Sequence, residues 1–389
     1  MGTAGFPAWP VRTEGVIAPD ERLPWPQTCA MGAQHVVAMF GATVLAPLLM
    51  GFDPNVAVLM SGVGTLVFFA ITQGRVPSYL GSSFAFIGVV IAATGYAGGG
   101  PNANLPVALG GIVACGLVYT LVGFAVMASG TTWIERLMPP VVTGAVVAVI
   151  GLNLAPIAVK GASSTPFDAW MAVMTILCVG GIAVFTRGLV QRLLILVGLA
   201  LACVIYGILA NGMGLGKPIA LAGIAAAPWI GAPRFAAPVF DGNAIALIAP
   251  VAVILVAENL GHLKAVGAMT GRNLDPMIGR AFVGDGVATM IAGSVGGTGV
   301  TTYVENIRVM AVTQIYSTRV FVVAAVIAVV LGFSPKFGAL IQAIPAAVLG
   351  GVSIVVFGLI AAAGARIWVD NRVDFADNSN LIVAAVTLV

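Results

Sequence analysis

Apolar stretches recur along almost the whole of this chain, and each is long enough to cross a bilayer as a helix. About 20 apolar residues in helical form cover a hydrocarbon core of roughly 30 Å. Hydrophobic residues make up 60% of the chain and charged residues only 8%, whereas about 25% of the residues in soluble domains are charged. The sequence therefore predicts an integral membrane protein built from helices.

Twelve such spans are predicted, and a thirteenth begins at "NLIVAAVTLV", where the sequence stops. A polar, proline-rich segment over residues 1–28 precedes the first span and lacks the basic-then-apolar order of a cleaved signal peptide. The first apolar segment is therefore expected to remain in the membrane. The predicted spans are 29–51, 54–73, 84–97, 105–128, 139–159, 168–186, 193–211, 244–266, 278–294, 303–313, 318–334 and 346–368.

The basic residues are distributed unevenly between the predicted loops. Most of them fall on the same side of the membrane as the N-terminus. Cytoplasmic loops carry an excess of Lys and Arg, so the N-terminus is predicted to be cytoplasmic. The basic residues on the side opposite to the N-terminus are Lys160, Lys217, Arg234 and Lys336.

The net charge of +3 is too small to indicate a nucleic-acid partner.

The small residues within the spans are predicted to be structural. Glycine occurs 50 times, and stretches such as "GGIVACG" and "VLGGV" indicate helices that pack closely through small residues. The cysteines lie in or beside apolar segments without the spacing of a disulfide framework or a metal site. Neither a disulfide nor a bound metal is predicted for Cys29, Cys115, Cys178 and Cys203.

Two segments do not read as ordinary spans. Residues 77–90, "PSYLGSSFAFIGVV", and residues 293–310, "GSVGGTGVTTYVENIRVM", begin as glycine-rich sequence and become helical only after a Ser-Ser or Thr-Thr pair and an aromatic residue. Each is the third span of its half of the chain. Glycine-interrupted segments at matching positions indicate an inverted-repeat transporter whose site lies where the broken helices meet. The spacing predicts repeats of seven spans.

Ionisable residues inside predicted spans are candidates for a functional site, because charge at membrane depth is costly. Glu258 and His262 are four residues apart and share a helix face, which suits a proton relay; a packing carboxylate and a histidine near the helix end beside Lys264 are the alternatives. Asp285 is equally compatible with proton coupling and with a structural hydrogen bond. The full set is His35, Glu258, His262, Asp285, Glu305 and Arg308.

Thr302 and Glu305 fit the pattern of a capping box at the start of the tenth span. A half-helix that begins there would direct its free N–H groups and its positive dipole end toward a polar ligand. A purely structural cap remains an alternative role for Glu305. Near the start of the first span, Gln34 and His35 are adjacent, so at most one of them need face the site.

These motifs together resemble the nucleobase–ascorbate transporters, and most closely their bacterial uracil permeases. The stretches that carry the resemblance are "QHVVAMFGATVLAP", "VPSYLGSSFAFIG", "AENLGHL" and "TTYVENIRVMAVT", and it extends from about residue 20 to the end. The resemblance implies an all-helical membrane fold of seven plus seven spans in inverted repeats, with short strands in the broken third and tenth spans. This chain would then stop within its thirteenth span.

The resemblance also implies domains and roles. Residues 1–28 would be cytoplasmic, 29–128 and 244–334 would form a core domain, 129–211 and 335–389 a gate domain, and 212–243 an external loop. Uracil would bind at Glu258, Glu305, Phe84, Tyr303 and Val304, with proton coupling through Glu258, His262 and Asp285. The supporting residues would be Ser83, Gln34, His35, Thr302 and Asn306.

The implied activity is proton-coupled import of uracil or a related pyrimidine by a multi-pass protein of the cytoplasmic (inner) membrane. No cofactor and no enzymatic activity is implied, and the bilayer, a proton and a second copy of the chain in a homodimer would be the partners. A purine, xanthine or urate permease is one alternative, and a transport-impaired truncated variant is another. An intramembrane aspartyl protease is disfavoured because Asp285 has no second intramembrane aspartate beside it.

Three residues depart from the family pattern, Val304, Arg308 and Gln314, and Arg308 departs from it most sharply. Arg308 occupies the place where the family usually has glycine, three residues after Glu305 and on nearly the same helix face. Residues at this spacing can form an ion pair. The sequence therefore predicts a Glu305–Arg308 pair that would weaken the contact of Glu305 with a neutral base and impair transport.

Overall fold

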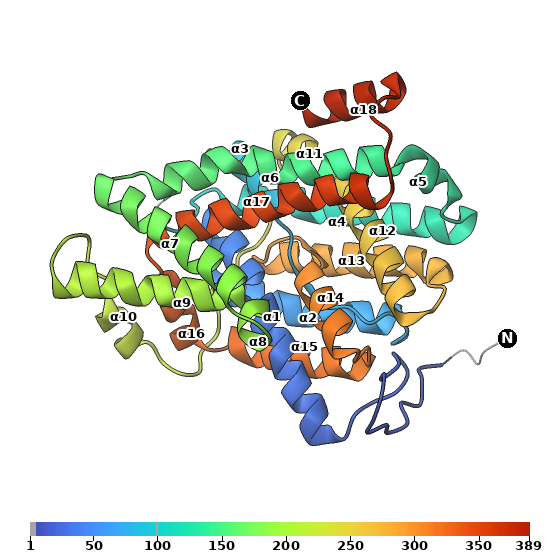
Figure 1. The fold of residues 1–389 in the computed structure, drawn as a ribbon, viewed down its shortest axis with the longest axis horizontal. Helices are drawn as coiled ribbons and strands as arrows, with labels where there is room; N and C mark the ends of the chain where they lie inside the picture. The colour runs from blue at the N-terminus through green and yellow to red at the C-terminus, as the bar shows by residue number, and fades with distance from the viewer. Residues whose placement is uncertain (1–4, 99) are drawn as a thin grey trace. The chain divides into compact units, whose positions relative to one another are not determined.

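The computed structural model describes residues 5–98 and 100–389, and most of them are α-helical (Figure 1). The elements are α1 (Trp25–Met50), α2 (Pro54–Ile71), β1 (Leu80–Ser82), α3 (Ala85–Thr94), α4 (Leu105–Ser129), α5 (Thr132–Leu137), α6 (Pro140–Ala162), α7 (Pro166–Phe185), α8 (Leu189–Arg192), α9 (Leu194–Gly207), the π-helical turn η1 (Ile208–Gly212), α10 (Leu221–Ala226), α11 (Gly242–Ile248), α12 (Val251–Thr270), α13 (Asp275–Val295), β2 (Val300–Thr302), α14 (Val304–Thr313), α15 (Thr318–Gly332), α16 (Pro335–Gln342), α17 (Ala346–Asp370) and α18 (Asn378–Leu388).

The helices confirm a multi-pass membrane protein. Within the described residues, eight helical stretches are long and apolar enough to cross a bilayer, or nine if α15 and α16, which meet at a bend of 82°, are taken as one span. Most predicted spans agree with the helices within a few residues. Short helices that were not predicted, such as α5, α10 and α16, lie between them.

The chain forms two compact units, and each unit takes one stretch from either half of the sequence. The first unit contains Met1–Thr131 and Pro228–Gly338, and the second contains Thr132–Ala227 and Ala339–Val389. In the second unit α17 packs along α6 and α7. A Cβ atom on Gly350 would come within 2.6 Å of the backbone nitrogen of Ala162, which confirms close packing at "VLGGV".

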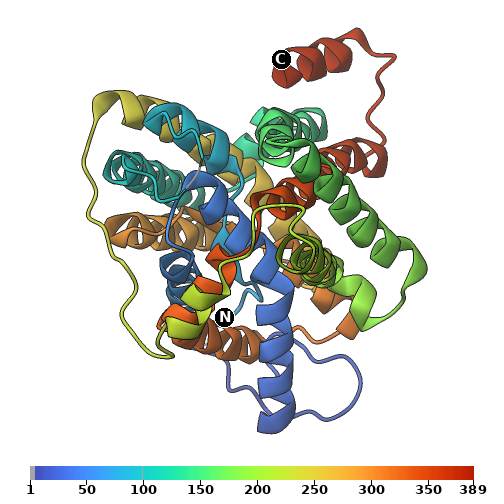
Figure 2. The same ribbon diagram turned by 90° about the vertical axis from the view of Figure 1, so that its left-hand side faces the viewer.

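In the first unit, α13 packs along α4 and α15 packs along α2; Figures 1 and 2 both show α4 and α13 side by side. Glycines at the contact allow the two backbones to approach. A Cβ atom on Gly116 would lie 2.7 Å from the backbone oxygen of Gly286, and one on Gly286 would lie 2.6 Å from the backbone nitrogen of Thr120. A side chain at either glycine would separate α4 from α13.

The two broken spans meet through a short antiparallel ribbon. Strand β1 precedes the half-helix α3, strand β2 precedes the half-helix α14, and Gly81 of β1 pairs with Thr301 of β2. The same order of strand and half-helix occurs in each half, and the strands run in opposite directions, as in an inverted repeat. The strands implied by the family resemblance are therefore confirmed.

Tyr303 covers this ribbon. Its hydroxyl donates to the carbonyl of Ser82 at 2.8 Å and accepts from Thr43 Oγ1 at 3.2 Å. The ring lies against Gly81, where an added Cβ atom would be 2.5 Å from the ring and 2.7 Å from Thr43 Oγ1. The glycine in β1 is therefore required by the position of this aromatic ring.

The N-terminal segment, residues 5–24, folds onto the first unit. The indole nitrogen of Trp9 donates to Thr318 Oγ1 at 2.8 Å, and the guanidinium of Arg319 lies 4.0 Å from the centre of the Trp9 ring. Asp20 forms an ion pair with Arg272 at 2.5 Å, just beyond α12. Ile17 bonds through its backbone to the residues that follow α14. The segment thus connects the ends of α12, α14 and α15.

Substitution of Gly81 tests the ribbon. We expect Gly81→Ala to lower the free energy of unfolding by about 1–3 kcal/mol, because the methyl group overpacks against the Tyr303 ring. The measurement is the melting temperature of the detergent-purified protein. Gly88→Ala in α3 is the control, since a Cβ atom there meets nothing within 4 Å. Equal melting temperatures for the two variants would contradict this account of the ribbon.

Candidate functional site

The predicted site residues all belong to the first unit, which also contains the β1–β2 ribbon. Because the strands are antiparallel, α3 and α14 begin at opposite ends of the ribbon. The first amide groups of a helix have no acceptor within the helix, and the dipole makes this end partly positive. The backbone at Val304, the first residue of α14, is therefore placed to donate hydrogen bonds to a ligand, and Phe84 is the N-cap residue of α3.

The capping box predicted at the start of α14 is wrong. The N-cap residue is Tyr303 and has no side-chain cap, so the helix begins one residue later than that pattern requires. The hydroxyl of Thr302 donates instead to Asn259 Oδ1 on α12, and it contacts His262 Nδ1 at 2.8 Å. Thr302 therefore connects the ribbon to α12, because pairing with a buried amide removes its hydroxyl from the helix end.

Glu258 and Glu305 are the two carboxylates with free oxygens beside the ribbon. Both residues are half-buried, and neither carboxylate hydrogen-bonds to another residue in the described part of the chain. The two groups are close enough to interact electrostatically. Without donors from other residues, these carboxylates remain available to a ligand that carries N–H groups.

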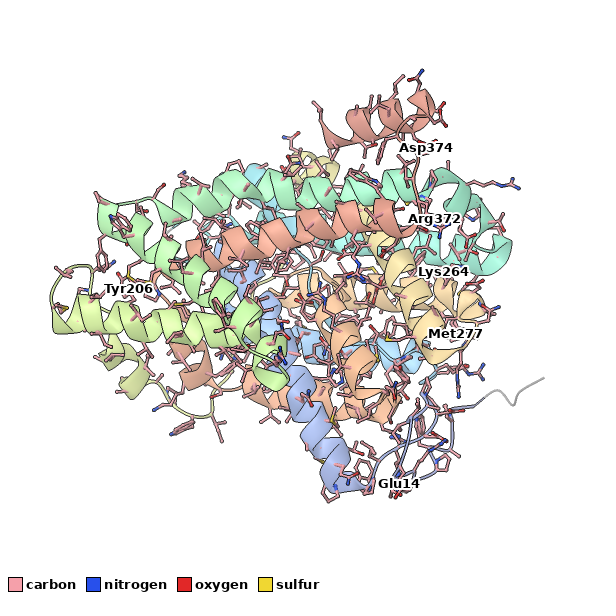
Figure 3. All side chains as sticks on the ribbon, in the orientation of Figure 1. Glu14, Tyr206, Lys264, Met277, Arg372 and Asp374 are labelled. Atoms are coloured by element: carbon pink, nitrogen blue, oxygen red, sulfur yellow. The ribbon has the colours of Figure 1, made fainter. Side chains whose placement is uncertain are left out.

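His262 lies one turn after Glu258 on α12, as its spacing requires, but no direct hydrogen bond joins the two side chains in the described residues. The ring of His262 turns toward Thr302 of β2. Lys264, labelled in Figure 3, forms an ion pair with Asp275 at 2.7 Å. His262 is therefore held beside the ribbon by its hydrogen bond with Thr302.

Asp285 is fully buried in α13, and its Oδ2 atom accepts a hydrogen bond from the hydroxyl of Tyr119 on α4 at 3.4 Å. Its other oxygen, Oδ1, has no partner in the part of the chain that the structure describes. The sequence predicted no role for Tyr119. A lone tyrosine in the middle of an apolar span was the available signal, because tyrosine is usually found near the membrane surface.

His35 and Asn306 connect α1 with α14. The amide nitrogen of Asn306 contacts His35 Nδ1 at 3.0 Å and donates to the carbonyl oxygen of His35 at 3.1 Å. His35 is buried and packs on the ring of Phe321 at 4.6 Å, whereas Gln34 is half-buried. Of the adjacent pair, His35 therefore supports α14.

Ser83 supports the start of α3. Its backbone N–H donates to the carbonyl of Gly299 at 2.9 Å, which continues the pairing of the ribbon, and its hydroxyl accepts from the N–H of Ala85 at 3.3 Å. The Ser83 hydroxyl therefore holds the first turn of α3, whereas α14 lacks the side-chain cap that the sequence predicted.

The predicted ion pair between Glu305 and Arg308 is also wrong. Arg308 is exposed, and within the described residues no hydrogen bond or ion pair joins the two side chains. Arg308 is three residues after Glu305 and acts on its carboxylate only as a nearby charge, without direct contact. Glu305 is therefore not neutralised by direct pairing.

No group of three or more His, Cys, Asp or Glu side chains that could hold a metal ion occurs in the described part of the chain. The cluster beside the ribbon consists of the carboxylates of Glu258 and Glu305 together with the hydrogen-bonded side chains of His262, Thr302 and Asn259. Such a cluster can bind a small polar molecule and hold a proton.

The sequence matches the model of a protein family described as "Permease family" over residues 26–389. The "Putative pyrimidine permease RutG" of Escherichia coli (strain K12) is 70% identical, with the alignment covering 100% of this chain and 89% of the relative. A "Uracil permease" of Paenibacillus larvae subsp. larvae is 40% identical, with 96% of this chain and 89% of that protein covered.

A solved structure has the same fold. The transmembrane domain of a cyanobacterium bicarbonate transporter, BicA, superposes with a TM-score of 0.66 and covers 94% of this chain and 96% of that chain. The sequence identity is 17%. This likeness therefore supports the inverted-repeat transporter fold, and it carries no information about the substrate.

Proposed function

The chain belongs to this permease family, that of the nucleobase–ascorbate transporters, and we propose that it carries uracil or a closely related pyrimidine across the cytoplasmic membrane together with a proton. The relatives are named permeases, so the protein is a transporter and not an enzyme. Two of the relatives are named for pyrimidine and uracil, which supports the choice of substrate.

The observation that carries the proposal is the pair of carboxylates, Glu258 and Glu305, beside the starts of two half-helices. Uracil has ring N–H donors next to carbonyl acceptors. A carboxylate accepts hydrogen bonds from N–H groups, and the free amides at a helix start donate to carbonyl oxygens. In this proposal Glu258 and Glu305 accept from the base, the backbone of Phe84 and Val304 donates to it, and Tyr303 bounds the site.

Proximity of the two carboxylates supports coupling to a proton. Two ionised carboxylates in a low-dielectric site repel each other, so a proton shared by the site lowers the electrostatic cost of closing it. Glu258 interacts electrostatically with Glu305 and with Asp285. In this proposal Glu258 takes up the proton with the substrate, and His262 and Asp285 support that step.

We assign the first unit as the core domain that holds the substrate and the second unit as the gate domain. The N-terminus is proposed to be cytoplasmic, as the distribution of Lys and Arg favours. We further propose a homodimer, which the family resemblance implies.

Uptake of radiolabelled uracil by cells at two external pH values tests the function. We expect uptake to rise at the lower pH and Glu258→Gln to lower it by about tenfold or more, because the amide keeps the shape but cannot carry the proton. Glu14→Gln is the control, since Glu14 is exposed on the N-terminal segment (Figure 3). Uptake that changes neither with external pH nor with the Glu258→Gln substitution would rule out proton symport. Stronger inhibition of uptake by unlabelled xanthine than by unlabelled uracil would indicate a purine carrier.

Arg308→Gly tests the departure from the family pattern. Since Arg308 is exposed and unpaired with Glu305, we expect the affinity for uracil to change by less than about fivefold, the range of an exposed charge interaction. The measurement is equilibrium binding of labelled uracil to purified protein. A tenfold gain in affinity would show that Arg308 neutralises Glu305 in the membrane.

A further inference from the structure

A continuous chain of four hydrogen bonds connects the ribbon with the buried carboxylate of Asp285. His262 Nδ1 contacts Thr302 Oγ1 at 2.8 Å, and Thr302 donates to Asn259 Oδ1. Asn259 Nδ2 donates to the hydroxyl of Tyr119 at 2.5 Å, and Tyr119 donates to Asp285 Oδ2 at 3.4 Å. The chain crosses from α12 through β2 and α4 to α13.

The donors in this chain all point the same way. Since the hydrogen of the Thr302 hydroxyl is directed to Asn259, the oxygen of Thr302 must accept from His262 Nδ1. The Asn259 amide keeps this direction, because its oxygen faces Thr302 and its nitrogen faces Tyr119. The neutral ring of His262 is thereby held as the tautomer with hydrogen on Nδ1, which leaves Nε2 as an acceptor.

We propose that Tyr119 is a positioning residue that transmits the protonation state of Asp285 to His262 and so couples the proton to the substrate site. This inference rests on the proposed function. No proton travels along these hydrogen bonds, because the Asn259 amide can donate and accept hydrogen bonds but does not pass a proton on. When the Tyr119 hydrogen turns, the hydrogen bond from Asn259 to Tyr119 changes in strength instead, and Asn259 passes that change to Thr302 and His262.

Tyr119 has two acceptors at equal distance, which makes such a change possible. Its hydroxyl lies 3.4 Å from Asp285 Oδ2 and 3.4 Å from the carbonyl oxygen of Leu255. When Asp285 is ionised, the hydroxyl donates to the carboxylate. When Asp285 takes up a proton, its O–H donates to the Tyr119 oxygen, the tyrosine hydrogen turns to Leu255, and the new donor competes with the amide of Asn259.

Tyr119 is the hydrogen-bond donor to an Asp285 carboxylate that is shielded from solvent. All of Tyr119, Asn259 and Asp285 are fully buried, and Asp285 Oδ1 has no partner among the described residues. Besides His262 at the end of these hydrogen bonds, the titratable group that acts on Tyr119 and Asp285 is Glu258 on α12, and Cys115 lies one turn before Tyr119 on α4. Helix α2, which also packs on α13, has no titratable residue over Pro54–Ile71.

The test compares Tyr119→Phe with Tyr79→Phe. Phenylalanine keeps the ring of residue 119, which packs on Phe282 at 5.4 Å, and removes only the hydroxyl. Tyr79 is an equally buried control whose hydroxyl bonds to Ser61, which does not belong to the series of hydrogen bonds from His262 to Asp285. We expect Tyr119→Phe to bind labelled uracil within about threefold of the unsubstituted protein, while uptake driven by a proton gradient falls about tenfold and loses its dependence on pH. Tyr79→Phe should keep that dependence.

A second pair of variants covers the case in which Tyr119→Phe fails to fold. Thr302→Val removes the hydroxyl while keeping the shape, and Thr302→Ser restores the hydroxyl, so we expect loss of the pH dependence in the first and its retention in the second. A normal pH response in either Tyr119→Phe or Thr302→Val overturns the inference and leaves the proposed function intact. Absence of a pH response in the unsubstituted protein overturns the proposed function itself.

Discussion

The site depends on the pairing of two strands that interrupt membrane-spanning segments. Backbone groups that leave a helix at membrane depth must find partners within the protein, and here β1 and β2 supply them to each other. The pairing requires Gly81 to lie beneath Tyr303, and it fixes where α3 and α14 begin. The positions of the carboxylates and of the free amide groups therefore follow from three residues of pairing on each strand.

Much of the architecture could be predicted from the sequence because bilayer thickness imposes a length on every span. Glycine-rich starts at 77–90 and 293–310 identified the broken helices, and the structure brings the two together. Small residues at "GGIVACG" and "VLGGV" indicated close helix contacts, which occur at Gly116 and Gly350. These features are visible because periodicity and residue size are properties of a single segment.

The contacts of individual polar side chains were harder to predict. Thr302 fitted a local capping pattern, yet it bonds to Asn259 and His262, which are about 40 residues away in sequence. Arg308 stands at ion-pair spacing from Glu305 but is exposed and forms no ion pair with it among the described residues. Local spacing gives the partners that are possible within one helix. It cannot rank them against partners that the tertiary fold brings from α12 or α4.

The N-terminal segment has a consequence for the order of folding. Trp9 and its partner Thr318 are 309 residues apart in sequence. Ribosomes add about 5–20 residues per second, so roughly 15–60 s pass between synthesis of the indole and synthesis of the threonine that receives its hydrogen bond. Throughout that interval the hydrogen bond to Thr318 cannot form, because α15 does not yet exist, although Phe69 of α2, on which the Trp9 ring stacks, is already made. Docking of the segment onto α15 is therefore a late event that follows synthesis of the tenth span.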